Sequence, residues 1–170
     1  LYTLAKAYLG VTRFFVTGRP LGHGDDILMN EDKNPNTAGV LRLCEGTPPR
    51  PLADLLKVVD EVDAVVALGG EIEIDAKELA ALKSKKVVTI SSHVGPLSRI
   101  AKIALPACSW AEIDGSYVNK QGRVQTSERA LVARGSALPG WLLIGKLGRA
   151  LGFATNWKRL SELRRAMVCD

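Results

Sequence analysis

Apolar residues in the middle of the chain follow two alternating periods. Residues 52–61 have the i, i+3, i+4, i+7 spacing of an amphipathic helix, with apolar side chains at Leu52, Leu55, Leu56 and Val59. Residues 62–68 continue as an almost unbroken apolar run that is rich in valine. Such a run predicts a strand that is buried on both faces of a parallel sheet.

The same alternation continues downstream. Residues 75–82 predict a second helix with Asp75 as its N-cap, residues 86–91 predict a second buried strand, and residues 103–105 a third strand closed by Pro106. Helices and strands that alternate at this spacing form βαβ units with right-handed crossovers. We therefore expect an α/β fold, in which an open and mostly parallel sheet carries helices on both faces.

The two ends of the chain are less regular. We expect loops over residues 18–26 and 30–37, and the other elements expected there are a helix over 1–9 that ends at Gly10, a short strand over 13–17, a β segment around Tyr117 and Val118, and helices over 140–151 and 157–167. One domain over residues 1–170 is predicted, with a loop-rich part (1–50), a core (51–153) and a C-terminal helix (154–170). Because the first residue is Leu1 and not methionine, we expect a fragment of a longer subunit.

Composition and charge narrow the class of protein. The chain is 46% hydrophobic and 24% charged, as in ordinary globular domains, and its net charge is +5. One cationic cluster lies near the C-terminus, at Lys158, Arg159, Arg164 and Arg165. Aromatic residues do not interleave with it, so we expect no nucleic-acid binding; the cluster is either a solvated helix face or a docking surface for an acidic partner subunit. No apolar run approaches the roughly 18 residues of a membrane span, and we expect no direct membrane insertion.

The cysteines and histidines do not form a metal-binding pattern. Cys44, Cys108 and Cys169 are far apart, and an iron–sulfur cluster normally needs four thiolates. His23 lies in a glycine-rich loop and predicts a solvated side chain. His93 follows a strand, where it is either a hydrogen-bonded loop residue or a proton donor. We expect no metal site, and the odd number of cysteines fits a reducing, cytoplasmic compartment.

Two glycines mark a candidate ligand site. Gly69 and Gly70 follow the first buried strand, and ligands of open α/β sheets bind beyond the carboxyl ends of the strands. There is no GxGxxG or P-loop fingerprint, and the acidic Glu71, Glu73 and Asp75 that come next would repel phosphate groups. The alternative is a tight turn without a ligand.

A second candidate is the polar run that follows Pro106. Asp114 begins a turn, Asn119 tolerates a positive φ, and Arg123 offers a planar donor fork for a carboxylate or phosphate. Glu112 is the expected internal acceptor for Arg123. In the alternative interpretation, Glu112, Asp114, Asn119 and Arg123 only hold this loop together by hydrogen bonds.

This run resembles a family signature. The chain reads AKIALP and then EIDGSYVNKQGRVQ, which is similar to the A-D-x-x-L-P and E-x-x-G-T-[FY]-x-N-x-E-G-R-x-Q of the molybdopterin oxidoreductase superfamily. The resemblance covers residues 54–153 and includes the ALPGW step into a helix at residues 137–141. It implies a Rossmann-like domain of that superfamily.

Within the superfamily, the segment DKNPNTAG at residues 32–39 is similar to the K-x-P-N-x-x-G stretch of the large iron–sulfur subunit of bacterial NADH–quinone oxidoreductase (complex I). In that subunit the corresponding region is a relic without molybdenum cofactor, packed beside the electron-transfer chain. The resemblance thus implies a structural or assembly role in a respiratory complex, without a cofactor in this chain. Its partners would be the other subunits, and its place the cytoplasmic side of the inner membrane.

Several positions depart from the family pattern. Lys102 replaces the aspartate of A-D-x-x-L-P, Ser116 a threonine and Gln121 a glutamate, and Gly70-Glu71 stands where an asparagine is expected near the cofactor's guanosine. One alternative is the guanine-dinucleotide (molybdopterin) binding domain of a formate-dehydrogenase-like enzyme. Its binding residues would be Gly69, Gly70, Asn119 and Arg123. Another alternative is an isolated small-molecule binding module.

Overall fold

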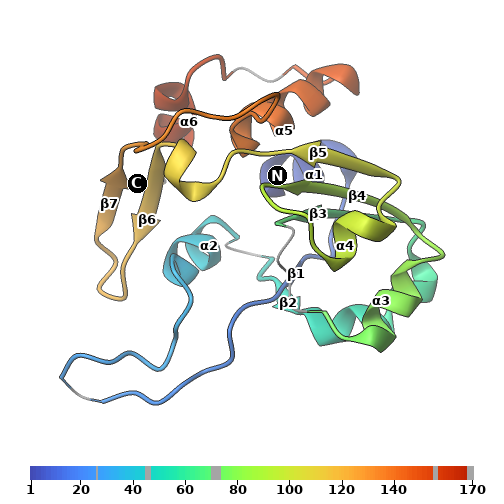
Figure 1. Ribbon diagram of the computed structural model, residues 1–170, viewed down its shortest axis with the longest axis horizontal. Coiled ribbons are helices and arrows are strands. Elements are labelled where there is room, and N and C mark those ends of the chain that lie inside the picture. The colour runs from blue at the N-terminus through green and yellow to red at the C-terminus, as the bar shows by residue number, and fades with distance from the viewer. Residues whose placement is uncertain (26, 45–46, 70–73, 155–156, 168–170) are drawn as a thin grey trace.

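The computed structural model describes residues 1–25, 27–44, 47–69, 74–154 and 157–167. At its centre lies a parallel sheet of order β3-β4-β5 (Figure 1), formed by β3 (Ala64–Leu68), β4 (Lys86–Ser91) and β5 (Ile103–Pro106). The central strand β4 is the best buried, with Val87, Thr89 and Ile90 fully shielded from solvent. The predicted parallel sheet is therefore confirmed.

One face of the sheet packs against four short helical segments, which are η1 (Leu52–Lys57), η2 (Val59–Glu61), α3 (Ala76–Leu82) and α4 (Pro96–Ile100). The apolar cluster between them consists of Leu55, Val59, Ala67, Leu82, Val87 and Leu97. Asp75 is the N-cap of α3, as predicted, because its carboxylate accepts the backbone N–H of Glu78 at 2.7 Å.

The other face is covered by α1 (Tyr2–Leu9) and α5 (Gly140–Ala150). Their cluster contains Leu4, Ile90, Leu143 and Ile144. The helix α1 ends at Gly10, whose φ of 64° lets the chain turn in the left-handed region. Helices on both faces of the sheet confirm the predicted open α/β architecture.

Two details of the core differ from the prediction. The segment predicted as one amphipathic α-helix over 52–61 is a pair of 3-10 helices, interrupted at Val58. The strand β3 is buried on one face only, and Val66 and Leu68 on its other face are 41% and 54% exposed. The reason is its position: β3 is an edge strand, and the predicted two-sided burial is reached only by the central strand β4.

The hairpin forms a smaller region beside the sheet (Figure 1), built from β6 (Gly115–Val118) and β7 (Val124–Ser127) together with α2 (Thr37–Leu43), η3 (Trp110–Glu112) and α6 (Leu160–Met167). The short strands β1 (Phe15–Val16) and β2 (Arg50–Pro51) pair with each other next to η1. The sequence did not predict α2 or β7. Residues 18–25 and 27–35 belong to a long loop that projects from the body. Among the described residues, no helix has the length and apolarity needed to cross a membrane.

Candidate functional site

The carboxyl edge of the parallel sheet is where the first predicted site residue lies. Gly69 follows β3 with a φ of 107°, and its N–H donates to the carbonyl oxygen of Ile90 at 2.9 Å. A Cβ atom built on Gly69 would meet no atom of the described residues within 4 Å, so they leave the space in front of this backbone open. Gly70, the second predicted residue, lies outside the described residues.

His93 lies on the loop that follows β4 at the same edge. The hydroxyl of Ser91 donates to the His93 carbonyl at 2.6 Å and accepts the His93 N–H at 3.1 Å. The hydroxyl of Ser92 lies 2.9 Å from Nδ1 of the ring. These contacts make His93 a hydrogen-bonded loop residue, which was one of its two predicted roles.

His23 lies on the projecting loop, and its side chain is exposed. Its carbonyl accepts a hydrogen bond from the Lys33 ammonium at 2.8 Å. No three His, Cys, Asp or Glu side chains within the described ranges gather in a way that could hold a metal ion. The thiols of Cys44 and Cys108 are buried and unbonded to each other, and burial raises the pKa of both.

Glu112 has a local structural role. Its carboxylate accepts hydrogen bonds from the backbone N–H of Ser109 at 2.8 Å and from the Ser109 hydroxyl at 2.9 Å, which closes a capping box around η3. These two hydrogen bonds, the backbone one first, lower the pKa of Glu112. The predicted pairing of Glu112 with Arg123 is wrong, because the whole length of β6 separates η3 from the turn that contains Arg123.

Asn119 and Arg123 lie in the turn between β6 and β7. The Asn119 amide oxygen accepts the backbone N–H groups of Gln121 at 3.1 Å and Arg123 at 2.9 Å, and its NH2 donates to the Gln121 side chain at 2.8 Å. Gly122 completes the turn with a φ of 79°. Both ends of the Asn119 amide therefore stabilise the turn, which agrees with the interpretation of this run as a hydrogen-bonded loop.

At the other end of the hairpin, the Asp114 carboxylate accepts the backbone N–H of Arg129 at 2.9 Å. This hydrogen bond joins the residue before β6 to the backbone that follows β7, and so closes the open end of the hairpin. A Cβ atom on the neighbouring Gly115 would come within 2.5 Å of the Tyr117 ring and 2.9 Å of the Ser127 hydroxyl, so a larger residue here would require these side chains to move.

Asn36 is a structurally important residue that the sequence did not single out. It precedes α2 with a φ of 64°, and its side-chain oxygen accepts the backbone N–H of Val118 at 2.8 Å. Gly39, one turn later, is buried so closely that a Cβ atom there would collide with the Asn36 amide oxygen. The N-x-x-G spacing of DKNPNTAG is therefore the signal of a contact between this segment and β6.

Arg164 stands out in the sequence only as one cation of a cluster. Its Nε donates to the Ser116 hydroxyl at 3.1 Å, and one of its terminal nitrogens donates to the Gly115 carbonyl at 3.0 Å. These bonds fasten α6 to β6. Between the two lies an open hollow of about 410 Å³, lined by Asp114, Thr126, Ser127, Glu128, Arg129 and Arg164.

The predicted cofactor residues do not lie together. Gly69 is at the carboxyl edge of the parallel sheet, whereas Asn119 and Arg123 are in the hairpin turn, well apart from that edge (Figure 1). The amide of Asn119 is already occupied within the turn. The structure therefore places Gly69 and the two turn residues on separate elements, and Gly69 has open space beside it among the described residues.

The architecture defines the class of protein: an open α/β domain in which a glycine directly follows the strand β3. The sequence profile described as "Molybdopterin oxidoreductase" matches residues 46–150, which is more than half of the chain. The chain belongs to the molybdopterin oxidoreductase family.

Its relatives include two kinds of oxidoreductase subunit. The chain is 40% identical over 68 residues to the F420-dependent formate dehydrogenase 2 subunit alpha of Methanococcus maripaludis, which covers 39% of this chain and 10% of the relative. It is 33% identical over 86 residues to the F420-dependent formate dehydrogenase subunit alpha of Methanocaldococcus jannaschii, covering 49% and 13%. It is also 34% identical over 86 residues to the mitochondrial NADH-ubiquinone oxidoreductase 78 kDa subunit of Neurospora crassa, covering 51% and 12%. The chain thus spans about a tenth of the length of these relatives.

Proposed function

We propose that this chain is the molybdopterin-oxidoreductase-like domain of the large iron–sulfur subunit of an NADH–quinone oxidoreductase. Its role there is structural: it packs beside the electron-transfer subunits on the cytoplasmic side of the inner membrane and binds no molybdenum cofactor. The similarity to the Neurospora 78 kDa subunit supports the assignment to this complex.

The observation that carries the proposal is that the polar side chains of the signature run form hydrogen bonds within their own loops. Glu112 closes a capping box and Asn119 holds the hairpin turn. Asp114, which lies between them outside the fixed positions of the signature, holds the start of the hairpin. Each of these polar side chains is engaged with its own loop, so it is not directed at a common ligand. Signature side chains that form only internal hydrogen bonds are typical of a domain with a structural role.

The proposal is tested on the complete natural protein, purified through an affinity tag from the organism that makes it. We expect other subunits of NADH–quinone oxidoreductase to migrate with it on a native gel, and elemental analysis to find no molybdenum bound by this domain. Stoichiometric molybdenum together with an extractable pterin would refute the proposal. So would a complex that contains no NADH–quinone oxidoreductase subunits.

A second candidate is a guanine-dinucleotide binding domain of a formate-dehydrogenase-like enzyme, favoured by the 40% identity to a formate dehydrogenase alpha subunit and by the open space at Gly69. Titration with guanosine monophosphate distinguishes it, because this candidate requires saturable binding below about 1 mM. The substitution Gly69→Ala should then weaken binding. Gly152→Ala is the matched control, since Gly152 also has a positive φ and open space around it but lies after α5.

A further inference from the structure

The hollow between the hairpin and α6 is the starting point of a separate inference. Its walls come from the residue before β6 (Asp114), the end of β7 with its following loop (126–129) and α6 (Arg164). All of these lining residues are polar or charged. Because Arg164 already donates to Gly115 and Ser116, the position of α6 relative to the hairpin is fixed.

The strand β7 forms one wall of this region and is an unprotected edge. Within the described part of the chain it pairs only with β6, and Val124, Gln125 and Thr126 are exposed. An edge strand presents unpaired N–H and C=O groups on its outer side. An extended peptide can add to such an edge as a further strand.

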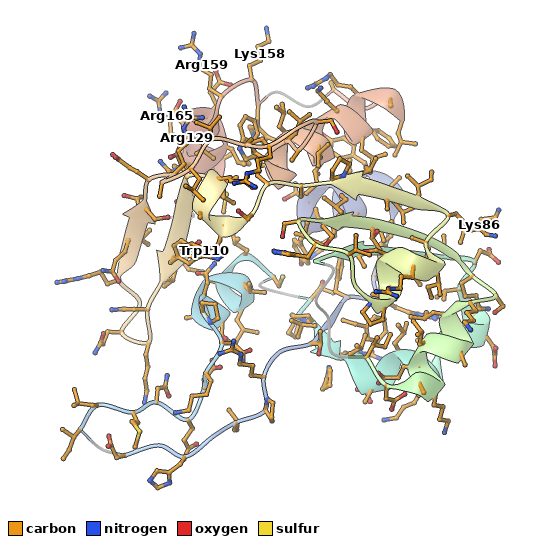
Figure 2. The ribbon with its side chains drawn as sticks, in the orientation of Figure 1. Lys86, Trp110, Arg129, Lys158, Arg159 and Arg165 are labelled. Atoms are coloured by element: carbon orange, nitrogen blue, oxygen red, sulfur yellow. The ribbon has the colours of Figure 1, made fainter. Side chains whose placement is uncertain are left out.

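Four exposed cations lie around the hollow and the end of β7, a part of the surface that we call the hairpin corner. Figure 2 shows Arg129, Lys158, Arg159 and Arg165 gathered beside the hairpin and α6, while Lys86 lies at the opposite end of the molecule. The Glu162 carboxylate accepts the backbone N–H groups of Lys158 at 2.6 Å and of Arg159 at 3.1 Å. The backbone that carries two of the cations is therefore held in place by a carboxylate of α6.

We propose that this corner docks an extended acidic segment of a partner protein. The main chain of the segment adds to the free edge of β7, and its carboxylates pair with Arg129 and Arg165. Arginine is suited to this role because its planar fork binds a carboxylate through two parallel hydrogen bonds. In an extended strand every second side chain points to the same side, so acidic residues at alternate positions face the cations together.

A nucleic acid fits the corner less well than an acidic peptide. Asp114 and Glu128 line the hollow between the cations and would repel a continuous row of phosphates. The free strand edge offers main-chain hydrogen bonds, which a peptide can satisfy along its whole length. An acidic peptide can also place its charges at intervals and leave apolar or hydroxyl side chains opposite Asp114 and Glu128.

The experiment uses the complete natural protein and a fluorescent peptide of about eight residues with alternating glutamate and threonine, long enough for one strand. Fluorescence anisotropy at low salt should show saturable binding that weakens as salt is added. The double variant Arg129→Glu/Arg165→Glu should weaken binding at least about tenfold. Lys86→Glu, which makes the same charge change far from the corner, should change it less than about twofold.

A second peptide tests the strand pairing. N-methylation of alternate backbone nitrogens removes the donors for the β7 edge and should also weaken binding at least about tenfold. Equal binding of the methylated peptide, equal loss in Lys86→Glu, or displacement of the peptide by a lower concentration of a single-stranded oligonucleotide would each overturn the proposal. Circular dichroism checks that the variants are folded.

This docking site goes beyond the assembly role proposed above. The metal analysis and the native gel test that role without reference to the hairpin corner. The peptide assay therefore fails or succeeds independently of the assignment to an NADH–quinone oxidoreductase.

Discussion

The parallel sheet and the hairpin region are held together by different forces. The sheet packs two apolar clusters against its faces, with residues such as Leu82 and Val87 almost completely buried. In the hairpin region, β6 is only half-buried, β7 is mostly exposed and α6 buries no residue fully. Its contacts are directional hydrogen bonds, from Val118 to Asn36 and from Arg164 to Gly115.

This difference explains where the family signature lies. Apolar burial depends on area and shape, so many combinations of valine, leucine and isoleucine can build the sheet. A hydrogen bond requires a particular donor or acceptor at a particular place. Several residues that match the family signature, such as Gly115, Asn119 and Gly122, are therefore found in the hairpin region, where hydrogen bonds and turns replace an apolar core.

The largest expected effect is in the core of the sheet. Replacing Leu82, which is 1% exposed, by alanine removes apolar contacts and leaves a cavity, and we expect a loss of about 2–5 kcal/mol in the free energy of unfolding measured with urea. Leu131→Ala is the control, since Leu131 is 58% exposed on the loop after β7 and should cost less than about 0.5 kcal/mol. Similar costs for the two variants would contradict the contrast drawn between the regions.

Asn36→Ala should produce a smaller loss that is confined to the hairpin region. The variant leaves the Val118 N–H without its acceptor and places alanine at a φ of 64°, which together should cost roughly 1–3 kcal/mol. Hydrogen exchange should accelerate at the Val118 amide and not at Val87 in the central strand. Equal acceleration at both amides would show that the two regions unfold as one unit.

Thr89→Val should stabilise the protein, in contrast to the first two variants. The Thr89 hydroxyl is fully buried in β4 and has no hydrogen-bond partner within the described structure. A methyl group in its place removes an unsatisfied polar atom, and we expect a gain of about 1 kcal/mol in urea denaturation. Thr126→Val on the exposed strand β7 should give no such gain, and a loss at Thr89 would reveal a partner for the hydroxyl.

The smallest expected effect is a change in pH dependence. The pKa of Glu112 is lowered in the folded protein, chiefly by the hydrogen bond from the Ser109 backbone. Its stabilising contribution is complete above the ordinary glutamate pKa of 4.5 and is lost as the pH falls through the lower pKa of the folded state. The difference in melting temperature between the wild-type protein and Glu112→Gln should therefore shrink below pH 4.5.

Ser109→Ala tests the same contact from the donor side. It removes the hydroxyl that donates to Glu112 at 2.9 Å and leaves the backbone N–H in place. The pH dependence should become shallower than in the wild-type protein and remain steeper than in Glu112→Gln. An unchanged curve in both variants would show that the capping box contributes nothing to stability.

The elements of the sheet could be predicted because their signals are local. The run around Val65 is apolar and β-branched, and Asp75 with Glu78 forms a capping box within four consecutive residues. The helix α2 and the strand β7 gave weaker local signals. The N-terminus of α2 is defined by Asn36, whose amide bonds a strand far along the chain, and β7 is exposed and gains its order from pairing with β6.

The candidate site depended still more on distant contacts. The sequence suggested one ligand site that includes Gly69, Asn119 and Arg123, and a pairing of Glu112 with Arg123. Spacing along the chain does not show that a strand of four residues points the hairpin turn away from both η3 and the sheet edge. Arg164 could be recognised only as one of several cations because nothing local connects it with Gly115, 49 residues away.

The sequence by itself determined the class of fold and the family, since helix and strand periodicity and the EIDGSYVNKQGRVQ run are written in neighbouring residues. The tertiary structure decided which strand is central, which face of β3 stays exposed, and how Asn36 and Arg164 hold the hairpin. The physical reason is the range of the interactions. Periodicity and capping act between residues a few positions apart, whereas burial and long-range hydrogen bonds exist only once the chain has folded.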